Sequence, residues 1–261
     1  MLGQVDHVVV LVACLDAAVE SYRARGFQVV IGGEHPGGTH NALVGFADGA
    51  YLELLAFREP ERPHAHRWYR FLSSGPGVID VCLASDDLPG EVERLRSRGL
   101  PYHGPAAGSR RRPDGQVVEW RGATPTDDLT GALPFLIQDV TPRELRVPGG
   151  EQAQHALGVI GLAAVTVAVS DLERAIREYQ SLLDAGEPER GQDEQFQAIT
   201  ATFTLGPHRI VLAQPAGSEG LVAHRIRLRG DGPVEVALLV ERLAEPRRLE
   251  IDGAHFVLQP A

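Results

Sequence analysis

The chain has 261 residues, of which 43% are hydrophobic and 23% charged, an ordinary composition for a globular protein with two compact units. Its formal net charge of -10 argues against nucleic acids and anionic membranes as partners, because neither is attracted to an acidic protein. All 25 basic residues are arginine, so Schiff-base chemistry and a lysine nucleophile are excluded.

No targeting or membrane-spanning segment is predicted. No basic segment precedes the first apolar run, and the longest apolar stretch, near residues 156–169, is shorter than the roughly 20 residues of a spanning helix. Cys14 and Cys82 lie far apart in apolar runs, which predicts buried free thiols and a reducing compartment. We therefore expect a cytoplasmic monomer or homodimer that binds a small molecule and has no nucleic-acid or membrane partner.

The same pattern of apolar run and helix occurs three times. From Val5 the chain reads VDHVVVLVA, followed by an amphipathic helix over residues 15–25 that Gly26 closes. VIDVCLAS from Val78 and LAAVTVAVS from Leu162 each begin another copy, again followed by a helical segment. Short strand-like runs come after each helix, so the repeated unit is predicted to be β-α-β-β-β.

Turn signals separate the strands within the first two units. THNALVGFA and AYLELLAF are joined by the DG pair at residues 48–49, which predicts a two-residue hairpin. In the second unit, the PDG turn at residues 113–115 leads into the strand QVVEWRG. A short helix over residues 64–72 is predicted to bridge the two units.

The C-terminal part follows the pattern less closely. After Pro215, the runs HRIRLR, VEVALLV and AHFVLQ predict strands without a convincing helix, as in a truncated fourth unit. Residues 145–158 are rich in Gly, Pro and polar residues and indicate a boundary. We expect two domains, a site-bearing pair of units over residues 1–147 and a structural part over residues 148–261.

These segments resemble a known superfamily. DHVVVLV, THNALVGFADGAYLEL and LPFLIQDVTPR are similar to the glyoxalase-like domain families of the vicinal oxygen chelate superfamily, which includes glyoxalases, bleomycin resistance proteins and extradiol dioxygenases. The resemblance implies an α+β fold in which repeated β-α-β-β-β modules form curved mixed sheets around a concave cavity, as two module pairs. It also implies metal ligands on the first and last strands of a module, but it specifies the reaction poorly.

Alternation along the strands selects candidate metal ligands. Residues two apart in a strand face the same side, which places His7 and Glu53 on the cavity face. A tight hairpin puts Glu53 opposite Val44, so that His40 joins them and Asn41 points away. Two imidazoles and one carboxylate form a ligand set for a divalent ion such as Zn, Fe, Mn or Ni. Alternatively, His7 and Glu53 only hydrogen-bond each other and His40 lies on the surface. No organic cofactor is predicted.

Glu53 and Asp80 are the candidate catalytic residues. Asp80 aligns with His7 in the second unit and is a charge within an apolar strand, which is costly unless it is paired or coordinated. It completes a metal set, acts as a base, or forms a structural salt bridge with an arginine. Ala164 occupies the aligned position in the third unit, and no carboxylate there matches Glu53, so we assign any chemistry to the N-terminal half.

Candidate ligand-binding residues lie near the only dense basic cluster, residues 110–112. The predicted turn places Arg110 and Arg112 on one face with Trp120, which suits a carboxylate or phosphate on an unsaturated ligand. The alternative for these arginines is a solvated hairpin tip. Tyr51 shares the cavity face with Glu53 and is a fourth candidate.

Two classes of function follow from these candidates. The leading hypothesis is a metal-dependent lyase or isomerase, in which the ion chelates vicinal oxygens of an oxygen-rich or anionic ligand and Glu53 or Asp80 moves a proton. The second is non-catalytic binding or sequestration of a small aromatic or anionic compound, as in resistance proteins. A ring-cleaving dioxygenase is less favoured, because the C-terminal half lacks the ligands.

Overall fold

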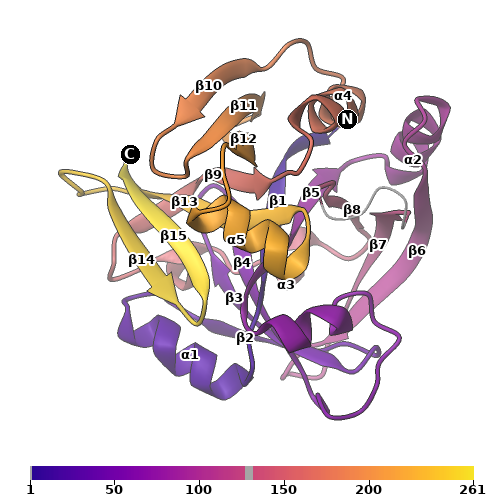
Figure 1. Ribbon diagram of the computed structural model, residues 1–261. Coiled ribbons are helices and arrows are strands. Elements are labelled where there is room, and N and C mark those ends of the chain that lie inside the picture. Colours follow the sequence, from indigo (N-terminus) through magenta and orange to yellow (C-terminus); the bar gives the residue numbers. More distant parts are fainter. Residues whose placement is uncertain (1, 127–131) are drawn as a thin grey trace.

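Eight strands of the N-terminal half close into a barrel. The computed structural model describes residues 2–126 and 132–261, and Figure 1 shows its two sheets. The barrel order is β1-β4-β3-β2-β6-β7-β8-β5. Its strands are β1 (Leu2–Leu11), β2 (Val30–Glu34), β3 (Thr39–Gly45), β4 (Tyr51–Phe57), β5 (Gly77–Ser85), β6 (Tyr102–Arg111), β7 (Val117–Pro125) and β8 (Phe135–Asp139).

Each half of the barrel is one β-α-β-β-β module, as predicted. Helix α1 (Leu15–Ala24) follows β1, and α2 (Leu88–Ser97) follows β5. The apolar residues of α1 recur at helical spacing and are buried on one face, namely Leu15, Ala18, Val19 and Tyr22. Gly26 ends this segment with a φ of 87°, a conformation that disfavours other residues.

The third module and the truncated fourth unit together form an open sheet of seven strands in the order β10-β11-β12-β9-β13-β15-β14. Its elements are β9 (Val159–Ala168), α4 (Leu172–Leu183), β10 (Glu189–Asp193), β11 (Ala198–Leu205), β12 (His208–Pro215), α5 (Gly220–Arg229), β13 (Gly232–Val240), β14 (Arg247–Ile251) and β15 (Ala254–Pro260). Residues 241–246, between β13 and β14, contain turns in place of a helix, as expected for a truncated fourth unit. The α+β class with curved mixed sheets is thus confirmed.

The predicted strand HRIRLR is wrong, because these residues form the second half of α5. Alternating arginines imitate the period of a strand. In the fold, however, Val222, Ala223 and Arg225 are buried against the sheet, and Arg225 is held by the carbonyls of Gly230 and Pro233. Val222 and Ala223 are adjacent and both buried, whereas a strand with one exposed face would bury only one of them. A helix places both of them and Arg225 against the sheet.

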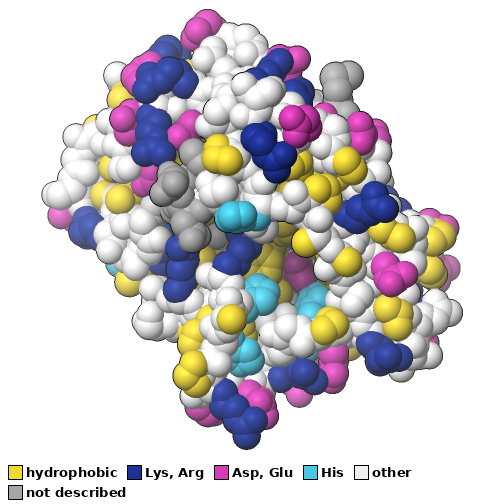
Figure 2. All heavy atoms as spheres, turned by 90° about the vertical axis from the view of Figure 1, so that its right-hand side faces the viewer, with side chains coloured by type: hydrophobic (Ala, Val, Ile, Leu, Met, Phe, Trp, Pro, Cys, Tyr) yellow, Lys and Arg dark blue, Asp and Glu magenta, His cyan; other side chains and the backbone are white. Residues whose placement is uncertain are grey.

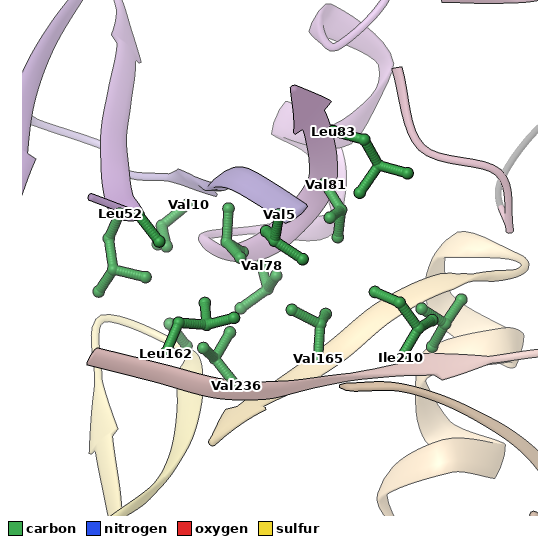
Figure 3. Packing of buried hydrophobic residues seen from close by; sticks show 14 of the residues in the cluster. Val5, Val10, Leu52, Val78, Val81, Leu83, Leu162, Val165, Ile210 and Val236 are labelled. Atoms are coloured by element: carbon green, nitrogen blue, oxygen red, sulfur yellow. The ribbon is translucent and has the colours of Figure 1, made fainter. Parts of the chain in front are cut away.

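The open sheet packs on the outside of the barrel. Figure 3 shows Val10, Leu52 and Val78 of the barrel in the same buried cluster as Leu162 and Val236 of the open sheet. This contact accounts for the run of apolar residues in β9, which is covered on both faces. Because this cluster lies outside the barrel, the barrel interior is left for a different set of side chains.

Within residues 2–126 and 132–261, three short elements connect the strands, and one of them, α3, contributes Arg146 to the wall of the barrel cavity. η1 (Tyr69–Ser74) links the two modules of the barrel, and the helix predicted over residues 64–72 begins only there, as a 3-10 turn. α3 (Arg143–Arg146) and η3 (Gly150–Ala153) lead from β8 to β9. No helix in the described part of the chain is long and apolar enough to cross a membrane.

The two cysteines differ in exposure. Cys82 is buried in β5, as predicted, but Cys14 is exposed. Cys14 precedes the first turn of α1, where the chain leaves the sheet, and it faces outward although its neighbours Val12 and Leu15 are buried. The prediction of a buried thiol at Cys14 was therefore wrong.

Candidate functional site

The barrel encloses a cavity of about 540 Å³. Figure 2 shows one face of the molecule hollowed, with histidine side chains around the hollow. Histidines, arginines and aromatic residues make up 11 of the 26 residues that line the cavity, and Glu53 is the one carboxylate among these described lining residues. The lining includes His7, His35, His66, His103, Arg67, Arg110, Arg146, Tyr51, Trp68, Trp120 and Phe135. The cavity therefore offers positive charge, flat rings and one carboxylate.

His7 lies between two carboxylates. Its Nδ1 is 2.6 Å from Asp6 Oδ1, and its Nε2 is 3.4 Å from Glu53 Oε2. Tyr51 stacks on the imidazole, with ring centroids 4.6 Å apart. His7 comes from β1 and Glu53 from the neighbouring parallel strand β4, so the sheet register brings them together as predicted.

Two further residues hold the Glu53 carboxylate. Asn41 Nδ2 donates to Glu53 Oε1 at 2.6 Å, and His35 Nε2 lies 3.8 Å from the same oxygen. The other ring nitrogen of His35 is 2.9 Å from Thr39 Oγ1. These contacts fix the position of the Glu53 carboxylate, which is buried in the cavity wall.

Charge pairing sets the protonation of the site. Burial acts to raise the pKa of Glu53, but the hydrogen bond and charge of His7, helped by His35 and Asn41, lower it to about 2. Burial acts to lower the pKa of His7, but Asp6 and Glu53 raise it above its usual value. The pKa of His35 is lowered, mainly by burial. The site therefore favours a His7 imidazolium, a Glu53 carboxylate and a neutral His35.

A buried network of ion pairs around Asp6 holds His7 on the side away from Glu53. Asp6 is fully buried, and Arg146 donates to both of its oxygens at 2.8 Å. Arg143 also pairs with Asp6, and Arg146 pairs with Asp139 and donates to the Tyr51 hydroxyl at 2.7 Å. Because Arg146 lies on α3, this network fastens the segment after β8 to the first strand of the chain.

His40 does not join this site, because the predicted register of β3 was wrong. Glu53 lies opposite Leu43 instead of Val44. The connection between β3 and β4 is longer than a two-residue hairpin, since Gly45 pairs with Tyr51 across it. A shift of one residue turns every side chain of a strand to the other face, so Asn41 enters the cavity and His40 leaves it.

Arg110 enters the cavity and Arg112 does not. Arg110 is 3% exposed, its Nε has no hydrogen-bond partner, and no carboxylate of the described residues lies within ion-pair distance of it. It contacts Asn41 Oδ1 at 3.4 Å and the Arg146 carbonyl at 3.1 Å. Arg112 follows the end of β6 and is held by Asp114 and the Leu145 carbonyl. Of these two arginines, only Arg110 lies where it can contact a ligand in the cavity.

Two glycines make room for three side chains of the cavity wall. A Cβ at Gly32 would lie 2.1 Å from Asn41 Oδ1 and 2.9 Å from an Arg110 nitrogen. A Cβ at Gly108 would lie 2.3 Å from Trp120 Nε1, so the indole lies directly across the β6 backbone. Trp120 lines the cavity on the same face as Arg110, as predicted.

Asp80 lies behind the cavity wall and does not line it. Its Oδ2 accepts a hydrogen bond from Trp68 Nε1 at 2.7 Å and pairs with Arg67, and its Oδ1 accepts from the Val81 N–H at 2.8 Å. The structure therefore shows the arginine salt bridge that the sequence left open, and both carboxylate oxygens are occupied.

A family model matches most of the sequence. Residues 5–183 match the glyoxalase-like domain family. The chain belongs to this family. Its fold is that of the vicinal oxygen chelate superfamily, which confirms the resemblance and implies a protein that binds small molecules. No curated protein sequence matches the chain.

Solved structures agree with this glyoxalase-like fold. A hypothetical protein from Staphylococcus aureus has a TM-score of 0.74 at 16% identity, covering 98% of this chain and 99% of that one. A mutant of 4-hydroxymandelate synthase from Streptomyces coelicolor has a TM-score of 0.58 at 14% identity, covering 92% and 71%. A fusion of a xylose isomerase-like TIM barrel with 4-hydroxyphenylpyruvate dioxygenase has 0.57 at 16%, covering 93% and 37%. Such identities show the fold alone.

One buried group of this glyoxalase-like protein could hold a metal ion. Among the described residues, Asp6, His7 and Cys82 place their ligand atoms within 4.8 Å of one another. However, Arg146 already occupies both oxygens of Asp6, and burial raises the pKa of the Cys82 thiol well above its usual value. An ion there would have to displace a guanidinium group and a thiol proton.

A second group faces the cavity. His7 and His35 approach opposite oxygens of Glu53 through their Nε2 atoms, at 3.4 and 3.8 Å. Their Nδ1 atoms contact Asp6 and Thr39, an arrangement typical of metal-binding histidines, whose second nitrogen is held by a neighbouring oxygen. The donor types are those that Zn, Fe, Mn or Ni prefer, with His35 of the loop after β2 in place of His40. Among the described residues, however, only Asp6, His7 and Cys82 bring all their ligand atoms within 4.8 Å of one another.

Sequence reasoning missed Asp6, His35, Asn41 and Arg146. Asp6 carried a usable signal, because it is a charge inside an apolar strand, as Asp80 is. His35 lies in a loop rich in Gly and Pro, and Arg146 lies in the predicted boundary segment, so no strand alternation applies to either. Asn41 was excluded only by the register of β3.

Proposed function

We propose that the N-terminal cavity binds a small, oxygen-rich anionic molecule and that Glu53 and His7 move a proton on it, as in a lyase or isomerase. One observation supports this most strongly: the Glu53 and His7 pair shares the cavity with Arg110, a buried guanidinium that has no carboxylate partner among the described residues. A buried cation without a partner is costly, so an anionic ligand would be stabilised there.

Arg110, Trp120 and Tyr51 are the proposed ligand-binding residues. Arg110 pairs with a ligand carboxylate, while the Trp120 indole packs against it from the same wall. The Tyr51 hydroxyl accepts a hydrogen bond from Arg146, which leaves its own proton free to be donated to a ligand oxygen. Burial keeps the Tyr51 pKa well above its usual value, so Tyr51 stays a donor.

Glu53 is the proposed base. It takes a proton from a carbon next to a ligand carbonyl, and the electron pair moves to the carbonyl oxygen, where the His7 imidazolium balances the negative charge. Return of the proton to the opposite face of the same carbon gives a stereoisomer, and return to the far carbon of a conjugated ligand gives a positional isomer. A carboxyl with a pKa of about 2 is a weak base, but a ligand inserted between Glu53 and His7 would remove the hydrogen bond that lowers the pKa.

A divalent ion held by His7, His35 and Glu53 is the metal-dependent form of this proposal, in which His7 would lose its Nε2 proton and the ion would replace the imidazolium as the charge that balances the ligand oxygen. When bound, it would polarise vicinal oxygens of the ligand. Metal analysis of protein purified without chelator, compared with the His7→Ala and Glu53→Gln variants, tests this form. Equal metal contents in all three proteins would contradict it.

Deuterium exchange tests the proposed proton transfer. Small 2-oxo carboxylic acids are incubated with the protein in D₂O, and NMR follows loss of the C–H signal next to the carbonyl. We expect exchange above background with the wild type, loss with Glu53→Gln, and no change with Glu93→Gln, an exposed carboxylate of α2. Exchange that survives in Glu53→Gln would contradict the role of Glu53.

Sequestration without chemistry is the second candidate. It is favoured by the low pKa of Glu53, because a strongly paired carboxylate binds protons weakly. Binding that depends on Arg110 without deuterium exchange in the wild type would select sequestration over the lyase or isomerase.

A further inference from the structure

Arg67 forms a flat part of the cavity wall. Its guanidinium lies over two rings, with its central carbon 4.8 Å from the Trp68 centroid and 4.9 Å from the Phe135 centroid. Arg67, Trp68 and Phe135 all line the cavity. The side chain is 37% exposed, so the two rings and Asp80 do not cover it completely.

Asp80 fixes the position of this guanidinium. One oxygen of Asp80 binds both the Trp68 indole N–H, at 2.7 Å, and Arg67. The other oxygen is held by the Val81 backbone N–H at 2.8 Å. Asp80 therefore cannot swing away without breaking three contacts. It also balances the charge of Arg67, which leaves the guanidinium as a planar surface with little net charge to offer an anion.

Arg67 and Arg110 lie on different walls of the barrel. Arg110 belongs to β6 and contacts Asn41 of β3, whereas Arg67 contacts Phe135 of β8 and Asp80 of β5. Only β7 separates β6 from β8, but the Arg110 guanidinium reaches Asn41 of β3, and three strands separate β3 from β8 in either direction. His7 of β1 and Glu53 of β4 lie on the arc between them. A ligand that reaches from Arg110 to Arg67 would pass over the proton-transfer pair.

We propose that Arg67 is the specificity-determining residue of the cavity and that it stacks on the planar part of the ligand. Guanidinium groups stack on flat conjugated groups, and contacts with Trp68, Phe135 and Asp80 restrict the orientation of the Arg67 guanidinium. Asp80 is a positioning residue that acts through Arg67 and Trp68. The ligand class is then a small aromatic or conjugated monocarboxylate, with its carboxylate at Arg110. This inference rests on the proposed function, because it requires an anion at Arg110.

Two carboxylates of similar size test the inference. Phenylacetate has a flat ring and cyclohexylacetate a puckered one, and calorimetric titration measures the affinity of each. We expect the wild type to prefer phenylacetate about fivefold, which corresponds to one stacking contact of about 1 kcal/mol. Arg67→Lys keeps the charge and removes the plane, so it should abolish the preference. Asp80→Asn keeps an acceptor for Trp68 and loses the ion pair, and it should reduce the preference.

The controls separate this inference from the proposed function. Arg96→Lys alters an exposed arginine of α2 and should retain the preference. Both tryptophans of the chain, Trp68 and Trp120, line the cavity, so their fluorescence reports whether a variant keeps the cavity intact. Binding that depends on Arg110 but shows no preference for the flat ring, or a preference that survives in Arg67→Lys, would overturn the inference alone. No binding of either carboxylate would overturn the proposed function.

Discussion

Replacing Asp6 by asparagine tests whether the buried ion pairs of Asp6 stabilise the fold around the cavity. Asp6 is fully buried and pairs with Arg146, Arg143 and His7. Asparagine keeps the shape of the Asp6 side chain but removes its charge. The Arg146 side chain, which is 2% exposed, then has Asp139 as its only carboxylate partner among the described residues. Removing one partner of a buried ion pair costs about 3–5 kcal/mol, because the other charge stays buried. We expect the free energy of unfolding to fall by this amount.

Urea unfolding followed by tryptophan fluorescence measures the change, and Asp139→Asn is the matched control. The Asp139 carboxylate is 23% exposed and should cost less. The pKa of Asp6 lies well below 3.8, because Arg146 and His7 outweigh the effect of burial. Its stabilisation is therefore present above the unfolded pKa and is lost as the pH falls towards the folded one, so the two proteins should converge in acid. A loss below about 1 kcal/mol near neutral pH would refute the network.

Three further predictions concern the cavity and the C-terminal half. Arg110→Gln should weaken binding of a small carboxylate about tenfold, whereas Arg112→Gln should not, because Arg112 lies outside the cavity; calorimetry that found equal losses would reject this assignment. Burial raises the pKa of Glu235 from 4.5 to about 7 despite Arg248, so its contribution to stability is complete below pH 4.5 and is lost as the pH rises through 7. Thermal melts of Glu235→Gln should lack this loss, and an unchanged pH profile would be inconsistent with the shift. Truncation after Val147 should expose the barrel face that packs on the open sheet and cause aggregation, whereas a soluble monomer by gel filtration would contradict this packing.

The module pattern could be predicted because it depends on local signals. The runs beginning at Val5, Val78 and Leu162 alternate or are continuously apolar, and each is followed by a helical segment, so the order of elements is repeated in the sequence. The resemblance to a known family then supplied the arrangement of the modules. The family match confirmed the resemblance, and the strand order shows the arrangement. The domain division at residue 147 stays a prediction.

The candidate site was only partly predictable, because its geometry depends on register and long-range pairing. His7 and Glu53 sit on adjacent strands, and their faces followed from alternation. Whether His40 or Asn41 faces the cavity depends on one residue in the length of the loop between β3 and β4. The DG pair alone does not determine that length. The contact between Asp6 and Arg146 spans 140 positions in the sequence, and no local pattern encodes it.

A crystal structure of the complex with a small carboxylate tests whether the barrel cavity holds an anion at Arg110 beside the proton-transfer pair. We expect the carboxylate on Arg110 and a ligand carbon next to Glu53, inside the barrel and within reach of His7. Density for the ligand on the open C-terminal sheet, or in the barrel with Arg110 unengaged, would contradict the account.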